Sequence, residues 1–93
     1  EPLWCLPLGD AYDRAIDSPI ADMKNIADGG FGAGSSIGAQ FTKRFVKKET
    51  VWAHLDIASV AWISKDKSVS PRGATAFGVR LLDRFVADNF EAK

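Results

Sequence analysis

The sequence contains a single cysteine, a single histidine and no long apolar run in its 93 residues. One cysteine, Cys5, excludes a disulfide within the chain and favours a reducing compartment. It lies in the apolar run Leu3–Leu8, so we expect a buried, unreactive thiol. No stretch approaches the roughly 20 apolar residues of a membrane-spanning helix, and no signal peptide is visible. We therefore expect no membrane partner.

Charge of either sign is not in excess, because twelve basic residues balance twelve acidic ones. The densest basic cluster is Lys43, Arg44, Lys47 and Lys48. It falls on the expected outer surface of a helix, and we interpret it as a solvated face. Nucleic-acid binding needs a stronger basic bias, so we expect no such partner. What the sequence does have is 46% hydrophobic residues, enough for a folded core and too many for a disordered chain.

Two segments have the pattern of strands. Leu3–Leu8 is short and apolar and contains Pro7, which is typical of a terminal or edge strand. Val51–Val60 is nearly all apolar and rich in β-branched and aromatic residues. Because a strand that is apolar on both faces is typical of a covered sheet, we predict that it lies inside one.

Helical spacing of apolar residues predicts three helices, over residues 11–17, 37–47 and 75–89. The buried stripe expected for the last helix is Phe77, Leu81, Leu82, Phe85 and Val86. Residues 28–36 contain four glycines and predict a loop, and residues 62–73 are polar and predict another.

The order strand, helix, loop, helix, strand, helix indicates an α/β fold. Two strands cannot complete a doubly wound sheet, so the missing strands must come from a longer chain or from a partner. We therefore predict a partial mixed sheet flanked by helices, as a fragment of a larger domain.

No constellation in the chain predicts catalysis. His54 and Asp56 alternate on the expected central strand, where a metal pair or an acid–base pair is conceivable, but a single histidine there is usually a satisfied core residue. A metal site needs three or four ligands at suitable spacing. No nucleophile elbow surrounds any serine, and the glycine-rich loop lacks a phosphate-binding signature. We predict no catalytic residue and no metal ligand.

One stretch and its flanks do resemble a known family. Residues 52–58 read WAHLDIA; before them come Leu6–Leu8 (LPL) with Tyr12, Asp17-Ser18, and ADMKNI over residues 21–26. These motifs, in this order, resemble the C-terminal part of the catalytic domain of the leucyl aminopeptidase, or cytosol aminopeptidase, family. The resemblance covers essentially all of residues 1–93, which we assign as that C-terminal segment.

The resemblance implies a cytoplasmic hydrolase that removes N-terminal residues from peptides, leucine preferred, with two divalent metal ions, zinc or manganese. One metal ion would polarise the scissile carbonyl and the pair would activate a bridging water. It also implies a three-layer catalytic domain and a hexamer. The family's metal ligands, catalytic lysine and arginine lie upstream of the matched region, so we predict that the segment alone is inactive and supplies scaffold, pocket wall and oligomer contacts.

What the resemblance transfers to this chain is part of the substrate pocket. Ala58 and Ala61 resemble positions that line the pocket for the substrate's N-terminal side chain, and Ile26 resembles a residue on the leaving-group side. Plain core packing is the alternative for each.

The chain departs from the family in a longer glycine-rich stretch and in Ser59, where the family has glycine. A non-enzymatic interaction domain that shares the fold fragment is the alternative function.

Overall fold

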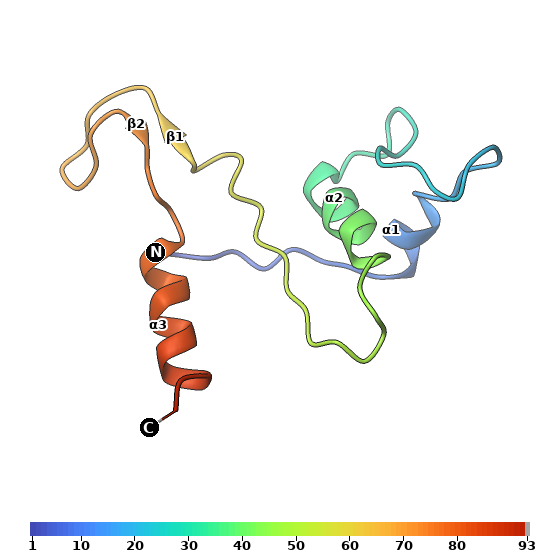
Figure 1. Ribbon diagram of the computed structural model, residues 1–93. Helices are drawn as coiled ribbons and strands as arrows, with labels where there is room; N and C mark the ends of the chain where they lie inside the picture. The colour runs from blue at the N-terminus through green and yellow to red at the C-terminus, as the bar shows by residue number, and fades with distance from the viewer. Residues whose placement is uncertain (93) are drawn as a thin grey trace. The chain divides into compact units, whose positions relative to one another are not determined.

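The computed structural model describes residues 1–92, which form two compact units. One unit is Trp4–Asp56, and the other joins Glu1–Leu3 to the part of the chain that starts at Ile57. The elements are α1 (Asp10–Arg14), α2 (Gly34–Lys43), β1 (Trp62–Ile63), β2 (Gly73–Ala74) and α3 (Val79–Asn89) (Figure 1). The chain is therefore a small α/β structure with one two-stranded antiparallel sheet among the described residues.

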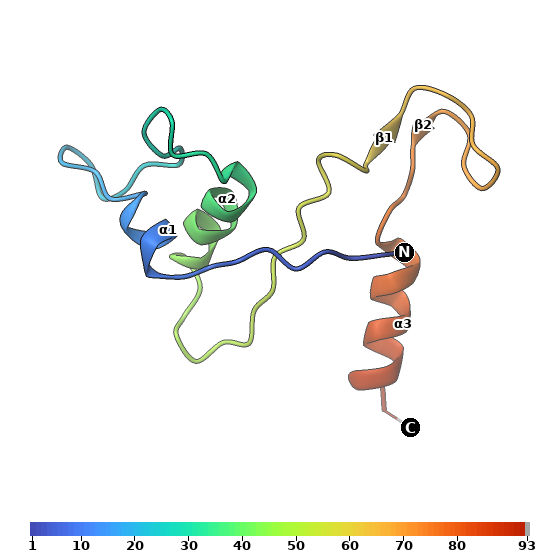
Figure 2. The ribbon, with the colours of Figure 1, turned by 180° about the vertical axis from the view of Figure 1, so that it is seen from behind.

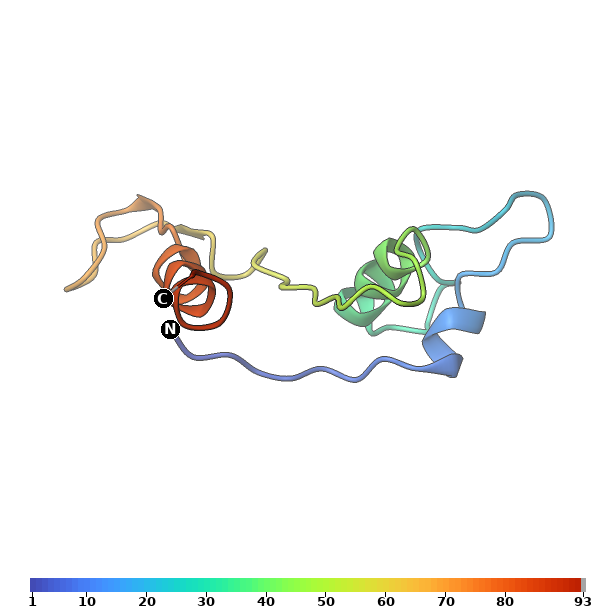
Figure 3. The same ribbon diagram turned by 60° about the horizontal axis from the view of Figure 1, so that its bottom comes forward.

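The unit Trp4–Asp56 is built on the packing of α1 against α2, which lie side by side in Figures 1 and 3. Ile16, Ile37 and Ala39 are its buried apolar residues, and Ile16 is completely buried. The Ser36 hydroxyl donates a hydrogen bond of 2.7 Å to the carbonyl oxygen of Pro7. Because a five-residue helix is not stable by itself, α1 depends on these contacts with α2.

The other unit contains a short hairpin. Trp62 pairs with Ala74 and Ile63 with Gly73, and Gly73 has a φ of 118°, a conformation that suits glycine. Thr75 extends the pairing, because its amide donates to the Ala61 carbonyl at 2.9 Å and its hydroxyl to the Val60 carbonyl at 2.5 Å. The hairpin is held by backbone bonds more than by a core.

Helix α3 follows the hairpin and packs on no other helix or strand among the described residues (Figure 2). Its first turn is capped by Glu1, whose carboxylate accepts hydrogen bonds from the amides of Gly78 and Leu81, the latter at 3.0 Å. The stripe predicted to be buried is not: Leu82 and Phe85 remain 45% and 49% exposed. Neither α3 nor any other helix in residues 1–92 has the length and apolar character needed to cross a bilayer.

The three predicted helices are confirmed, with shifted ends. α1 ends three residues before the predicted end, α2 begins at Gly34 and ends at Lys43, and α3 begins at Val79 instead of residue 75. These helices form because their spacing of apolar residues and their hydrogen bonds are local to each segment.

The two predicted strands are wrong for this structure, and so is the predicted mixed sheet. Leu3–Leu8 and Val51–Val60 both lack regular structure, and Cys5 is exposed instead of buried. A strand forms only when a neighbouring strand supplies a ladder of N–H and C=O partners, and among the described residues the one ladder between strands joins β1 to β2. The predicted loop over residues 62–73 is also partly wrong, because β1 and the first residue of β2 lie within it.

Candidate functional site

A shallow hollow of about 300 Å³ lies in the unit Trp4–Asp56, beside the glycine-rich loop and the first turns of α2. It is lined by Asn25, Ile26, Ala27, Asp28, Gly29, Gly30, Gly32, Gly34 and Ile37. Ile26, predicted from the resemblance to contact substrate, is therefore in the wall of a hollow and is 73% exposed. Its side chain is accessible to a ligand.

Glycines give the loop its shape. Gly30 and Gly32 have φ values of 88° and 73°, in the left-handed region where a side chain is strained. Lys24 and Asp28 form an ion pair of 2.6 Å across the start of the loop. The wall combines apolar side chains such as Ile26 and Ile37 with loop backbone, and it contains no histidine, cysteine or serine. The residues that line the hollow therefore offer no imidazole, thiol or serine hydroxyl as a nucleophile.

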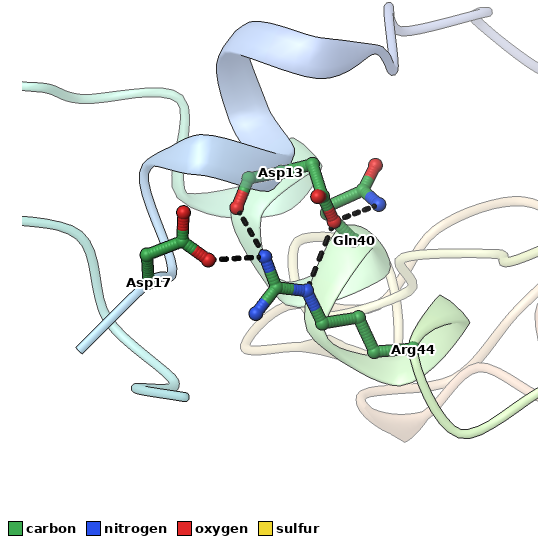
Figure 4. A network of polar contacts seen from close by, with 4 residues as sticks. All are labelled: Asp13, Asp17, Gln40 and Arg44. Carbon is green, nitrogen blue, oxygen red and sulfur yellow. Dashed lines mark hydrogen bonds and ion pairs between the residues drawn. The ribbon is translucent and has the colours of Figure 1, made fainter. Parts of the chain in front are cut away.

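A polar cluster joins α1 to α2, and we call it the Arg44 clamp (Figure 4). The Arg44 Nε donates to Asp13 Oδ1 at 2.9 Å, and its Nη2 donates to the Asp13 carbonyl and to Asp17 Oδ1, both at 2.7 Å. Gln40 Nε2 donates to the same Asp13 oxygen at 2.9 Å. The bond from Arg44 holds the pKa of Asp13 below its usual value of 3.8, and Asp13 in turn raises the pKa of Arg44.

The clamp corrects the interpretation of Arg44 as part of a solvated face, because its side chain is only 20% exposed and is paired twice. The sequence did contain a signal for it. Asp13 and Asp17 are four residues apart, so they follow one face of a helical turn and offer two acceptors to a single guanidinium.

Ala58 and Ala61 lie in the other unit, where the chain turns before β1. The amide of Ala61 donates to the Ile57 carbonyl at 2.9 Å, which closes that turn. Ala58 is exposed and Ala61 is half-buried. The structure thus brings the two alanines into one turn, whereas Ile26 belongs to the unit Trp4–Asp56.

His54 is exposed, so its interpretation as a buried core residue is wrong here, for the same reason that the strand around it is not formed. Its ring lies 6.1 Å from that of Trp52. Across residues 1–92, no three or more His, Cys, Asp or Glu side chains gather closely enough to hold a metal ion. The described residues therefore do not fit a metal centre.

The described residues form a small α/β structure with a two-stranded sheet, and their sequence matches a known family. The model of the catalytic domain of the cytosol aminopeptidase family matches residues 1–83. This chain belongs to that family, as the WAHLDIA stretch and its flanking motifs predicted.

The chain is similar over almost its whole length to proteins named probable cytosol aminopeptidase. It is 54% identical to the one from Wolbachia pipientis over 92 residues, which cover 99% of this chain and 18% of that protein. The identity is 56% over 86 residues to the one from Gluconobacter oxydans, covering 92% of this chain and 17% of that protein. The identity to the one from Rickettsia bellii is 50% over 91 residues, which cover 98% of this chain and 18% of that protein. The chain spans about a fifth of the length of these relatives.

Proposed function

We propose that these residues are the C-terminal part of the catalytic domain of a cytoplasmic aminopeptidase that removes N-terminal residues, leucine preferred, from peptides. The observation that supports this most is the match of residues 1–83 to the catalytic-domain model. Relatives between 50% and 56% identical carry the same activity in their names. In this proposal the chain supplies scaffold and part of the peptide site, and the reacting groups belong to the rest of the protein.

Two sides of the peptide site are assigned to this chain. Ile26 lies on the leaving-group side, and Ala58 and Ala61 line the pocket for the N-terminal side chain. The exposure of Ile26, and its place in an apolar-walled hollow of about 300 Å³, support its assignment. The small size of alanine supports the assignment of Ala58 and Ala61, because a branched substrate side chain such as leucine needs space that a larger wall residue would fill.

The proposed enzyme uses two divalent metal ions, zinc or manganese, held by residues outside this chain. The described residues themselves do not fit a metal centre, because no three or more of their His, Cys, Asp or Glu side chains lie close enough together to hold a metal ion. The proposal also includes a three-layer domain and a hexamer. Exposed apolar residues support further packing: Trp4 is 87% exposed, and Leu82, Phe85 and Val86 are each nearly half exposed along one helix.

The test is to express the full-length protein from the gene that encodes these residues and to measure hydrolysis of leucinamide and leucyl dipeptides with added Mn²⁺ or Zn²⁺. We expect metal-dependent release of leucine. A full-length protein without such turnover, or a gene without upstream lysine, aspartate and glutamate residues to serve as catalytic groups and ligands, would refute the proposal and favour a non-enzymatic interaction domain.

The pocket assignment has its own test, the substitution Ala58→Leu in the full-length protein. Three added carbons should fill the pocket and lower kcat/KM for leucyl peptides roughly tenfold or more relative to alanyl peptides, since one methylene is worth about 1–3 kcal/mol in such a pocket. The matched control is Ala92→Leu, the same change at an exposed alanine with no assigned role. An equal loss on both substrates would overturn the assignment of Ala58.

A further inference from the structure

The loop between α1 and α2 carries the hollow, and it is anchored chiefly through α1. The amide of Lys24 donates to the carbonyl oxygen of Ile16 at 2.8 Å, which ties the middle of the loop to the end of the α1 turn. The ring of Phe31 meets that of Tyr12 edge to face, with centroids 6.2 Å apart. The position of Ile26, two residues after Lys24, therefore depends on where the end of α1 is held.

Arg44 holds that end of α1. Its guanidinium binds the side chain and the carbonyl oxygen of Asp13, and it binds Asp17, the residue next to Ile16. A continuous set of contacts thus runs from Arg44 through Asp17 and Ile16 to Lys24, and from there along the chain to the hollow. Ile16 is fully buried, so this set of contacts passes through the most deeply buried side chain described in the unit.

The clamp contributes more to geometry than to stability. The side chains of Asp13 and Asp17 are 42% and 66% exposed, and ion pairs in such surroundings typically contribute about 0–1 kcal/mol. The planar guanidinium, however, engages three acceptors in fixed directions at once, which the single ammonium of lysine does not reproduce. Loss of the Arg44 guanidinium should therefore let the end of α1 move without unfolding the unit Trp4–Asp56.

We infer that Arg44 is a positioning residue, which fixes the loop of residues 18–33 and thereby shapes the leaving-group side of the peptide site around Ile26. The inference rests on the proposed function. It assigns Arg44 no contact with the substrate, because Arg44 acts through Asp17, Ile16 and Lys24. It goes beyond the family match, since none of the pocket residues proposed above belongs to the clamp.

The test compares two substrates in the full-length protein, leucyl-phenylalanine and leucinamide, of which only the first has a leaving-group side chain. Arg44→Lys and Arg44→Met should raise KM for the dipeptide roughly three- to tenfold, the cost of ordering one or two loop side chains on binding. The kcat values should stay within about twofold and KM for leucinamide should not change, because contact with the leaving group is equal in ground and transition states. The matched control is Lys48→Met, at an exposed lysine without an ion pair among the described residues.

A milder variant covers the case in which the Arg44 substitutions impair folding. Asp17→Asn keeps an acceptor and removes its charge, and it should raise the dipeptide KM in the same direction by about two- to threefold, within the range of about 0–1 kcal/mol for an exposed ion pair. Equal changes for both substrates, a fall in kcat with KM unchanged, or no change at all would overturn the inference, since each fits a structural role or none.

The failure of the proposed function gives a different result, namely a wild-type protein that hydrolyses neither substrate. The positioning role is then measured by hydrogen–deuterium exchange in the 93-residue chain. Peptides from residues 18–33 should exchange faster in Arg44→Met than in the wild type or in Lys48→Met. Unchanged exchange in that loop overturns the inference whatever the activity.

Discussion

Helix α3 is expected to need a covering surface that the described residues do not provide. Nucleation of a helix, with a constant near 10⁻³, costs about 4 kcal/mol, and eleven residues that include Val, Asp, Phe and Asn regain little of it by propagation. Three side chains of its apolar stripe, Leu82, Phe85 and Val86, are still about half exposed. Burying their exposed halves would supply stabilisation that the helix lacks in this structure. Full burial is worth about 1.5–3 kcal/mol for each such side chain, so covering the exposed half of all three adds about 2–4 kcal/mol.

The perturbation is separation of the 93-residue chain from the rest of the full-length protein, and the assay is amide hydrogen exchange followed by mass spectrometry. Since 1.4 kcal/mol is a factor of ten, peptides from Val79–Asn89 should exchange roughly 30- to 700-fold faster in the separated chain. Helix α2 is the internal control, because it buries four of its own residues and should differ less between the two proteins.

Equal protection of α3 in the separated chain and in the full-length protein would refute this reasoning. It would mean that the stripe is not covered in the full-length protein, or that the helix is stable without cover. A second variant separates these cases: Phe85→Ala should cost about 3–5 kcal/mol where the ring is buried and far less where it stays half exposed.

Three further predictions concern the 93-residue chain. It should not hydrolyse a leucine anilide with added Mn²⁺ or Zn²⁺, and metal-dependent turnover would contradict the assignment of ligands outside it. Hydrogen bonds from the amides of Gly78 and Leu81 hold the pKa of Glu1 below its usual value of 4.5, Gly78 having the larger effect. The cap should therefore be fully present above pH 4.5 and be lost as the pH falls through the lower folded value. Circular dichroism at 222 nm should show less helix in Glu1→Gln than in the wild type at pH 7, with the difference vanishing in acid; equal helix content at pH 7 would contradict the cap. Cys5, exposed here, should react with an aromatic disulfide at least tenfold faster than in the full-length protein, where we expect Leu3–Leu8 to be covered; equal rates would argue against that cover.

The sequence predicted the parts of the fold whose interactions are local. The repeat of Ile37 and Phe41 along one face predicted α2, although it placed both ends of the helix too late. It also led us to expect strands at Leu3–Leu8 and Val51–Val60, and neither is formed. The composition of those segments is that of buried strands, but composition does not provide the neighbours whose backbone groups a strand requires.

The candidate site was predictable only through resemblance. Neither the hollow nor its glycine loop has a chemical signature in one sequence, so Ile26 could be assigned only from the ADMKNI match. That assignment stays a prediction, and the structure adds that Ile26 lines the hollow. Arg44 was misassigned because charge alone does not distinguish a solvated arginine from a paired one. The partners of Arg44 lie 27 to 31 residues away, beyond any helical period.

The short span of the Arg44 clamp has a consequence for the order of folding. Its bonds, like that from Ser36 to Pro7, join residues 27 to 31 positions apart, whereas the bonds between Glu1 and the first turn of α3 span 77 and 80 positions. Because the entropy lost on closing a loop grows with its length, the clamp is the less costly of the two to form. The α1–α2 pair can therefore assemble as soon as Arg44 has been synthesised. We expect Val51–Val60 and the stripe of α3 to need surfaces from the rest of the full-length protein, so a truncated chain would expose these segments and leave the α1–α2 pair intact.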